Sequence, residues 1–312
     1  MERAKQHNPL WSRFWPAAGG DWSEKQLAFL LNVPTAALVL LIVAYPLVYV
    51  FLISLQSVTI SGLRSGNTPF VGLANYVTIF SDSLFLTTLG RTLVMSFVSV
   101  TLMISLGLFM ALAMNQKVKI ATLTRALILL PWAVPPIANG IMWGFIYNSR
   151  YGHLNALLYS LGLIDDFISI IGDPFLAQVG VIWAYVWRVI PFSALLFYAA
   201  LQGIPEELYE AAEVDGANTW QQFWKITLPM LRPVIAVLLI LRTAFAMTIF
   251  DEVFAITQGG PGDSTWTAAW YSYWNSFRLL KIDIGAASSF VLAVIITLFA
   301  LVYIRFVYRP SE

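Results

Sequence analysis

Long uninterrupted runs of apolar residues recur along the chain. Six of them provide the about 20 residues that a helix needs to cross the hydrocarbon core of a bilayer. They occupy residues 27–55, 92–114, 126–147, 175–201, 234–257 and 284–306. The runs do not alternate between apolar and polar residues as barrel strands would, and a spanning segment must satisfy its own backbone groups. The pattern therefore predicts an all-α polytopic membrane protein with six transmembrane helices.

The first run is longer than a bilayer requires and contains Pro34 and Pro46, so we expect it to tilt, kink or overrun the membrane. Residues 1–26 precede it and mix prolines with acidic and basic residues, without an apolar segment of their own. This composition is not that of a cleaved signal peptide, so the first run is interpreted as an uncleaved anchor. We divide the chain into an N-terminal tail, residues 1–26, and a membrane domain, residues 27–312.

Composition agrees with a membrane environment. Hydrophobic residues make up 59% of the chain and charged residues 11%, against about 25% charged residues in a soluble domain. The charges are scattered and the net charge is +1, so no nucleic-acid partner is expected. The partner that this composition requires is a lipid bilayer.

Lysine and arginine are distributed unevenly between the loops. If the N-terminus is inside, the inside segments hold eleven basic residues, namely Arg3, Lys5, Arg13, Lys25, Lys117, Lys119, Arg125, Lys225, Arg232, Arg305 and Arg309. The outside segments hold five, namely Arg64, Arg91, Arg150, Arg278 and Lys281. Cytoplasmic loops carry the excess of basic residues in membrane proteins. The distribution therefore predicts that both termini lie in the cytoplasm.

The sequence lacks the residues of several kinds of chemical site. It has no cysteine, and its two histidines, His7 and His153, cannot form an HExxH zinc site. It has no GxxxxGK[ST] phosphate-binding loop, because no lysine follows the glycine-rich run at residues 259–262. We predict no catalytic residue, no metal and no cofactor in this chain. If ATP drives the protein, another chain must bind it.

The segment at residues 202–232, between the fourth and fifth runs, predicts two short helices. Pro205 suits the first turn of a helix, and Glu206 and Glu207 complement the positive end of its dipole. Gly216 is a natural helix end. The alternative is a solvated loop that only joins two spans.

A second helix is predicted to start at Thr219, with Gln222 as its capping-box partner, and to end at Pro229. One stripe of that helix is expected to consist of Trp220, Phe223, Trp224 and Thr227.

The amino-acid sequence of this segment resembles a motif of a known family. Glu210-Ala211-Ala212-x-x-Asp215-Gly216-Ala217, followed by Phe223-x-x-Ile226-Thr227-Leu228-Pro229, is similar to the EAA loop of binding-protein-dependent ABC permeases of the maltose type. Further matches are Gly72-Leu73-x-Asn75-Tyr76, Leu130-Pro131 and Thr257-Gln258-Gly259-Gly260-Pro261-Gly262, the last typical of the F-like permease. The resemblance extends over nearly the whole chain from about residue 27. The chain lacks the large periplasmic insertion of the maltose permease itself.

The resemblance implies the type I ABC importer permease fold and a bacterial or archaeal inner (plasma) membrane. It further implies a complex with a second permease, two ATPase subunits that bind ATP and Mg²⁺, and an extracytoplasmic binding protein that delivers a sugar or sugar derivative. In such a complex the segment at residues 202–232 would transmit the work of ATP to the membrane domain. The coupling residues would be Glu206, Glu207, Glu210, Ala211, Ala212, Asp215, Gly216 and Ala217.

Arg188 and Arg242 lie within predicted spans, where an arginine costs about 2.5–3.5 kcal/mol and usually faces a polar interior or a partner. Either can line a solute pathway and meet a polar or anionic sugar group. The alternative is pairing with Asp251 or Glu252, or a bond to backbone near a helix break.

The resemblance places Tyr185, Arg188 and Phe192 on a cavity-facing surface, although aromatic residues also serve helix packing. Asn139 is either a pathway residue or an interhelical contact. The full candidate pathway set is Asn139, Tyr185, Arg188, Phe192, Arg242 and Asp251.

Two other classes of protein remain to be distinguished. A secondary transporter driven by an ion gradient would show related halves with broken helices or paired carboxylates at midplane, and no internal repeat is evident. A membrane-embedded enzyme would need a nucleophile and a base, which do not accompany the acidic pair Asp251 and Glu252.

Overall fold

The computed structural model describes residues 24–115 and 121–306. The predicted N-terminal tail, residues 1–26, lies outside the described residues except for its last three. Contacts between Cα atoms divide the chain into two units, Met1–Leu52 and Ile53–Glu312. In the first unit, α1 (Glu24–Val39) and η2 (Leu40–Ala44) lead into α2 (Tyr45–Ser54). The first apolar run is therefore helical throughout, with a wider π-helical turn before Pro46.

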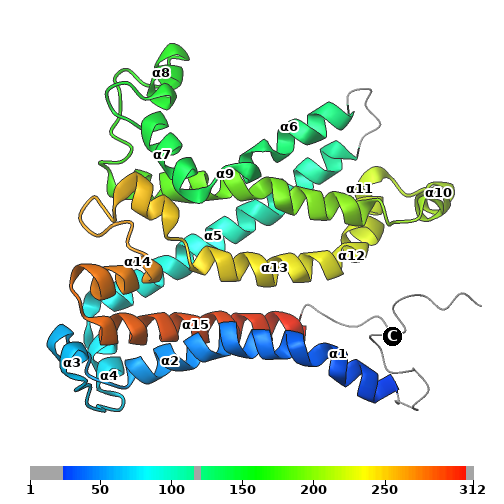
Figure 1. Cartoon of the computed structure of the whole chain (residues 1–312). Helices are drawn as coiled ribbons and strands as arrows, with labels where there is room; N and C mark the ends of the chain where they lie inside the picture. Colours follow the sequence, from blue (N-terminus) through cyan, green and yellow to red (C-terminus); the bar gives the residue numbers. More distant parts are fainter. Residues whose placement is uncertain (1–23, 116–120, 307–312) are drawn as a thin grey trace, which may run out of the picture. The chain divides into compact units, whose positions relative to one another are not determined.

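The second unit consists of helices joined by turns, and no strand is present in the ranges that the structure describes. Figure 1 shows their arrangement. The elements are α3 (Ile60–Ser65), α4 (Ala74–Ser81), α5 (Ser83–Met114), α6 (Ala121–Ala133), α7 (Pro136–Ile146), α8 (His153–Ser160), α9 (Pro174–Leu201), α10 (Glu206–Val214), α11 (Thr219–Gln222), η3 (Phe223–Thr227), α12 (Leu228–Met230), α13 (Arg232–Met247), η4 (Val253–Thr257), α14 (Ala268–Tyr273), η5 (Trp274–Arg278) and α15 (Ile282–Phe306).

Within the described residues, four helical stretches are by themselves long and apolar enough to cross a membrane: Leu31–Ser54, Ser83–Met114, Pro174–Leu201 and Ile282–Arg305. Two bent pairs also qualify if each counts as one span. They are Leu127–Ala133 with Pro136–Ile146, bent by 106°, and Thr219–Met230 with Arg232–Met247, bent by 62°. The predicted all-α fold is confirmed. Five of the six predicted spans overlap the four helices and the first bent pair, and the remaining one, at residues 234–257, overlaps only the second arm of the other pair, Arg232–Met247.

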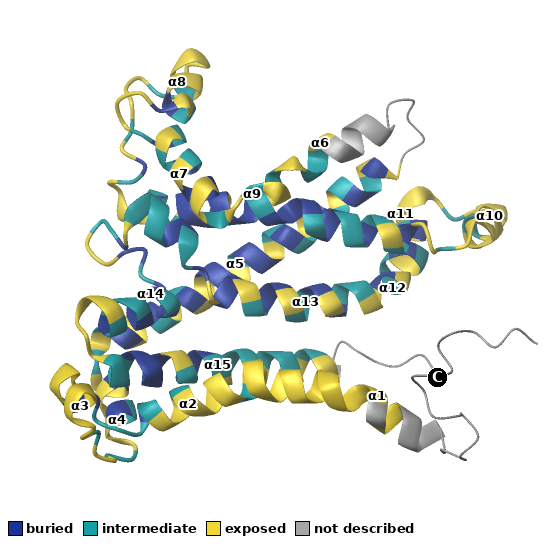
Figure 2. Cartoon of the chain, in the orientation of Figure 1, coloured by how far each residue is buried: buried dark blue, intermediate teal, exposed yellow. Residues whose placement is uncertain are grey.

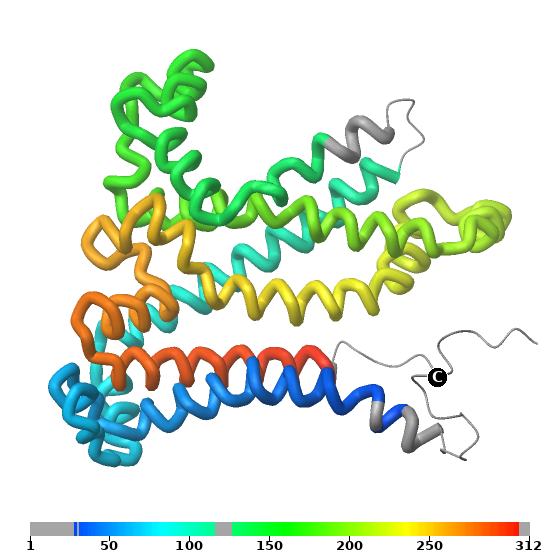
Figure 3. The backbone as a smooth tube through the Cα atoms, in the orientation of Figure 1, coloured from blue at the N-terminus to red at the C-terminus, as the bar shows by residue number. Residues whose placement is uncertain are grey.

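The third run, predicted as a span at residues 126–147, is broken into two helices, α6 and α7. The chain leaves the helix between α6 and α7, where two prolines follow each other at Pro135 and Pro136. Proline has no N–H to donate, and it pushes the preceding residue out of the helical conformation. The sharp change of direction between α6 and α7 can be followed along the tube in Figure 3.

The fifth run, predicted as a helix over residues 234–257, ends early at Met247. The chain is not helical at Ile249 and Phe250, and resumes as a short turn before η4. The hydroxyl of Thr267 donates to the carbonyl of Ile249 over 2.8 Å. A side chain thus satisfies a carbonyl that the break exposes inside the protein, which is the condition for a helix break at membrane depth.

The core of the second unit lies where α5, α9 and α13 pack together. Figure 2 shows dark, buried residues concentrated along α9. Small residues bring α5 close to α9, because a Cβ on Gly107 would lie 2.9 Å from the Cβ of Ser193. A second cluster joins Ile79 and Phe85 to Tyr271 and to α15.

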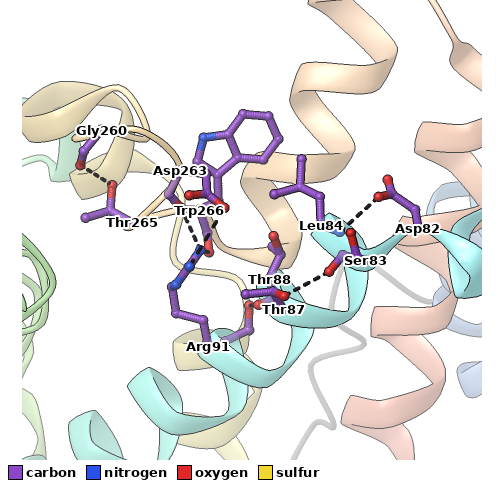
Figure 4. Close-up of polar contacts among 11 residues, drawn as sticks. Asp82, Ser83, Leu84, Thr87, Thr88, Arg91, Gly260, Asp263, Thr265 and Trp266 are labelled. Atoms are coloured by element: carbon purple, nitrogen blue, oxygen red, sulfur yellow. Dashed lines mark hydrogen bonds and ion pairs between the residues drawn. The ribbon is translucent and has the colours of Figure 1, made fainter. Parts of the chain in front are cut away.

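The glycine-proline stretch after η4 is held against α5 (Figure 4). Arg91 donates to the carbonyl of Asp263 over 2.6 Å, and its guanidinium lies 3.9 Å from the Asp263 carboxylate. The hydroxyl of Thr265 donates to the carbonyl of Gly260. The stretch at residues 257–262, which resembles a motif of ABC permeases, therefore belongs to an ordered turn that is held against α5.

Candidate functional site

The two helix breaks open a cavity of about 480 Å³ between α6, α9, α13 and the segment after α13. Its volume lies within the usual range of small-molecule sites, about 300–1,000 Å³. Of the candidate pathway residues, Tyr185, Arg188, Phe192, Arg242 and Asp251 line it. The breaks shape the cavity, since Trp132 and Pro136 reach its wall from either side of the first break and Thr248 to Glu252 from the second.

Arg188 is anchored by an ion pair across the cavity wall. Its Nε and Nη2 atoms donate to Oε1 of Glu252 over 3.2 and 3.1 Å. Glu252 is 2% exposed. The pairing between α9 and the segment after α13 matches the structural alternative raised from the sequence, with Glu252 rather than Asp251 as the partner.

Asn139 lies behind this ion pair rather than on the cavity wall. Its amide donates to the carbonyl of Ala184 over 3.0 Å and to Oε1 of Glu252 over 3.4 Å. It is completely buried, so it links α7, α9 and Glu252. The geometry corresponds to the interhelical contact that the sequence left open.

Arg242 is placed differently from Arg188. Its guanidinium lies 4.6 Å from the ring centroid of Phe192, a cation–π contact. Among the described residues, its Nε and Nη2 atoms have no hydrogen-bond partner, although the residue is only 6% exposed. The hydroxyl of Tyr185 is likewise buried and without a partner in the described part of the chain. Beside the cavity, two N–H-bearing nitrogens of Arg242 and the hydroxyl of Tyr185 are therefore buried without a hydrogen-bond partner among the described residues.

Sequence reasoning missed several residues of this wall. Trp132 was not among the candidate pathway residues, yet its ring centroid lies 5.3 Å from that of Phe192, with the two ring planes tilted by 44°. Phe245 and Phe250 were not singled out, and both line the cavity. Their only signal in the sequence was proximity to a helix break that the apolar pattern did not reveal.

Gly140 permits the approach that brings α7 to the ion pair. A Cβ at this position would collide with the Cβ of Ala255 and come close to the backbone of Glu252. Only glycine allows α7 and η4 to lie this close. The position next to Asn139 is thus fixed by packing.

The second candidate site is α10 with the turn that follows it. No side chain of α10 is buried, and Figure 2 shows this helix almost entirely exposed. Leu208 and Val214 are exposed apolar residues on it. The helix carries Glu206 and Glu207 in its first turn, as predicted.

Gly216 ends α10 as predicted. Its φ is +80°, in the left-handed region. The amides of Gly216 and Ala217 donate to the carbonyls of Glu213 and Ala212 over 2.9 and 2.8 Å. These two bonds form a Schellman motif, which satisfies carbonyls at the helix end and turns the chain sharply.

The next helix is capped one residue earlier than predicted. Asn218, not Thr219, is the N-cap, and Gln221, not Gln222, is its capping-box partner. The Asn218 side chain accepts from the amide of Gln221 and the Gln221 side chain accepts from the amide of Asn218, both over 2.9 Å. Asparagine ranks among the strongest N-cap residues, above threonine.

The prediction that Pro229 ends this helix is also wrong. The helix continues through η3 and α12 to Met230, and the bend follows at Leu231. The exposed aromatic residues Trp220 and Trp224 contact each other and Phe223, with ring centroids 5.3–6.1 Å apart. Tyr209 and Thr227 share a hydrogen bond of 2.9 Å between their hydroxyls. That bond ties α10 to the following helix, so residues 206–230 form one folded unit.

Comparison with known proteins identifies the family. Residues 103–309 match the model of the binding-protein-dependent transport system inner membrane component. The chain is 39% identical to the trehalose/maltose transport system permease protein MalF of Thermococcus litoralis, over 91% of this chain and 94% of that protein. It is 34% identical to the sulfoquinovosyl glycerol transport system permease protein SmoG of Agrobacterium fabrum, over 96% and 94%. The chain therefore belongs to the family of binding-protein-dependent transport permeases, as its EAA-like segment indicated.

A solved structure agrees in fold. A chain of a bacterial ABC transporter involved in the import of the acidic polysaccharide alginate superposes with a TM-score of 0.79, covering 92% of this chain and 96% of that chain at 22% identity. The predicted type I ABC importer permease fold is confirmed. The chain is a multi-pass membrane transport subunit and does not belong to an enzyme family.

Proposed function

We propose that this chain is one of two permease subunits of an ATP-driven importer for a sugar or sugar derivative. The observation that carries the proposal is the exposed α10, which is rigidly capped by the Gly216 turn and tied to the helix leading into α13. Its relatives named for trehalose/maltose and for sulfoquinovosyl glycerol support a sugar-type solute. The aromatic cavity between α9 and α13 supports a pathway through this chain.

In this importer α10 docks on an ATPase subunit. The coupling residues are Glu206, Glu207, Glu210, Ala211, Ala212, Asp215, Gly216 and Ala217, as proposed from the sequence. ATP and Mg²⁺ bind to two copies of that separate ATPase. A binding protein delivers the solute on the other side of the membrane, where α8 and the loop containing Asp165 and Asp166 lie. ATP and the loaded binding protein both favour one state of an alternating-access cycle.

Both termini lie in the cytoplasm in this proposal. The support is the distribution of basic residues, part of which, including Lys117 and Lys119, lies outside the described residues. The domain division follows: a cytoplasmic tail, residues 1–26, and a permease domain, residues 27–312, with its coupling loop at residues 202–232.

An ion-gradient transporter is the alternative that the test must separate. The chain is co-expressed with a candidate second permease, ATPase and binding protein, and the purified complex is placed in liposomes. We expect uptake that needs ATP and the binding protein and persists when an ionophore abolishes ion gradients. Uptake that continues without ATP and stops with the ionophore would overturn the importer assignment.

A further inference from the structure

Charge is divided along the coupling loop. Residues 206–215, which form α10 and its end, contain five acidic residues and no basic one. Residues 218–232 contain Lys225 and Arg232 and no acidic residue, and both basic side chains are exposed. The two halves of the loop therefore suit partners of opposite charge, a basic surface for α10 and an anionic surface for the half that follows.

The second half is built on the helix of α11, η3 and α12, residues 219–230, which we call the aromatic helix. Its buried side is occupied, since Gln222 donates to the carbonyl of Ala217 over 3.4 Å and Thr227 shares the hydroxyl bond with α10. Trp220 and Trp224, one turn apart, are 69% and 50% exposed. Within the described residues their ring contacts are only with each other and with Phe223 of the same helix.

The aromatic helix leads directly into a membrane-spanning segment. It ends at Met230, and α13 begins at Arg232 after a bend of 62°. Because a helix rises about 1.5 Å per residue, this bend places Trp224 about 6 Å and Trp220 about 8 Å before Arg232, measured along the axis of α13. The headgroup layer on each side of the hydrocarbon core is about 5–8 Å thick. If Arg232 marks the edge of the core, both rings lie within or at the edge of that layer.

We propose that the aromatic helix lies in the headgroup layer of the leaflet on the side of α10, with Trp220 and Trp224 inserted among the lipids. Indole rings favour this layer because they are apolar with one polar N–H. Lys225 and Arg232 then face the phosphate groups of anionic lipids. This inference rests on the proposed function only for the side, which makes the leaflet the cytoplasmic one.

The same charges argue against the ATPase as the occupant of this face. A basic surface that receives the acidic α10 would repel Lys225 and Arg232. Lipid phosphates attract both, and lipid also covers the exposed rings. The bond between Tyr209 and Thr227 joins α10 to the aromatic helix. The lipid surface therefore supports the coupling helix from the side opposite the ATPase.

The test measures what surrounds each ring in the purified complex in nanodiscs of neutral and anionic lipid. The chain has no cysteine, so Trp220→Cys and Trp224→Cys, made separately with cysteine-free partner subunits, each carry one nitroxide label. Oxygen reaches a label in lipid, nickel-EDTA-diacetate reaches a label in water, and neither reaches a label covered by protein. We expect the ratio of oxygen to nickel collisions to exceed several-fold that of Asp165→Cys, an exposed loop position.

A label at Thr219→Cys leaves both tryptophans in place and tests whether they hold the helix in the lipid. Thr219 is exposed and is not the cap of the helix. Adding Trp220→Ala with Trp224→Ala should lower the collision ratio at this label several-fold. Adding Trp220→Tyr with Trp224→Tyr should retain it, because tyrosine also favours the headgroup layer. The tyrosine pair separates a lost anchor from a misfolded loop.

Nickel access at both tryptophan positions would show that they face water, and shielding from both reagents would show that another subunit covers them. Either result overturns the lipid contact, as does an unchanged ratio at Thr219→Cys in the alanine pair. The proposed function is judged separately by ATP-dependent uptake. A complex that imports solute while these labels are shielded refutes the lipid contact alone, and labels in lipid without ATP-dependent uptake refute the importer alone.

Discussion

At the scale of single residues, two arginines that both lie within apolar runs have different environments. Arg188 is held by Glu252, while Arg242 is buried against the ring face of Phe192 and has no ion pair among the described residues. The sequence identified both as residues that need a partner, because an arginine within a span is costly. It could not assign the partner, since Glu252 reaches Arg188 only after the chain breaks beyond Met247.

We expect Arg188→Gln to destabilise the protein strongly. Removing one member of a buried ion pair leaves the other uncompensated and costs about 3–5 kcal/mol. The double variant Arg188→Gln with Glu252→Gln should recover much of this loss, because no buried charge then remains unpaired. Thermal unfolding of the purified complex measures both. Additive losses in the double variant would show that the two side chains are not coupled.

The cap of the helix after Gly216 provides a smaller, local test. Asn218→Ala should cost about 1 kcal/mol, because the amide of Gln221 loses its acceptor. Thr219→Ala should have little effect, since Thr219 is the first helical residue and not the cap. Thermal unfolding again reports the difference. A larger loss for Thr219→Ala would support the capping position expected from sequence alone.

At the scale of elements, the Gly216 turn determines where α10 points. No heavy atom lies within 4 Å of the Cβ that a side chain at Gly216 would add. A substitution there acts through backbone strain alone, about 1–3 kcal/mol for a residue forced into the left-handed region. Variants at Gly216 can therefore test how the backbone conformation of the turn affects coupling, without a steric clash inside this chain.

We predict that ATP-dependent uptake falls in the order Gly216, Gly216→Asn, Gly216→Ala, because asparagine tolerates the left-handed conformation better than alanine. Binding-protein-stimulated ATPase activity and retention of the ATPase subunits are measured alongside uptake. Gly203→Ala is the matched control at the start of the same loop, since Gly203 does not have a positive φ. If Gly216→Ala retains normal uptake, the turn does not orient the coupling helix.

Charge on α10 gives an independent test of docking. Glu210 is exposed, so Glu210→Lys should leave the helices folded while repelling a basic partner surface. We expect loss of the ATPase subunits during purification, or stimulated ATPase activity without uptake. Asp165→Lys makes the same change of charge at another exposed position and should retain the ATPase. Normal uptake by Glu210→Lys would make residues 202–232 a simple connector.

The sequence predicted these elements to different degrees. The length of the apolar run located α9 within one residue of its observed bounds, because a membrane-spanning helix consists almost entirely of apolar residues. Pro131 and Pro191 lie inside helices, whereas Pro135 and Pro136 coincide with a break. Proline alone therefore does not decide where a span breaks. The close approach of α7 to η4 at Gly140 is a tertiary contact that no local pattern contains.

At the scale of the whole molecule, the arrangement of loops across the membrane follows from the basic residues. The eleven-to-five excess was counted on six spans, and the part of the chain that the structure describes contains four unbroken candidate spans and two bent pairs. The count still applies if the α6–α7 pair crosses once and α13 forms the fifth crossing with residues 219–230 outside the membrane, because Lys225 lies in that first arm of the second pair. Helix α10 and the loop containing Asp166 then lie on opposite sides, since α9 separates them.

Reporter fusions test this arrangement directly. A reporter after Glu312 and one inserted at residues 116–119 should both report the cytoplasm, because basic residues flank these positions and resist translocation. A reporter near Asp166 should report the opposite side.

A fourth reporter, placed in the turn at Val134 between α6 and α7, distinguishes a bent span from a re-entrant pair. If the bent pair crosses once, Val134 lies within the membrane and its insertion should abolish assembly, while the Asp166 reporter stays outside. If α6 and α7 instead enter and leave by the same face, the Asp166 reporter becomes cytoplasmic. That outcome would remove one crossing and contradict both the six-span arrangement and the cytoplasmic placement of α10.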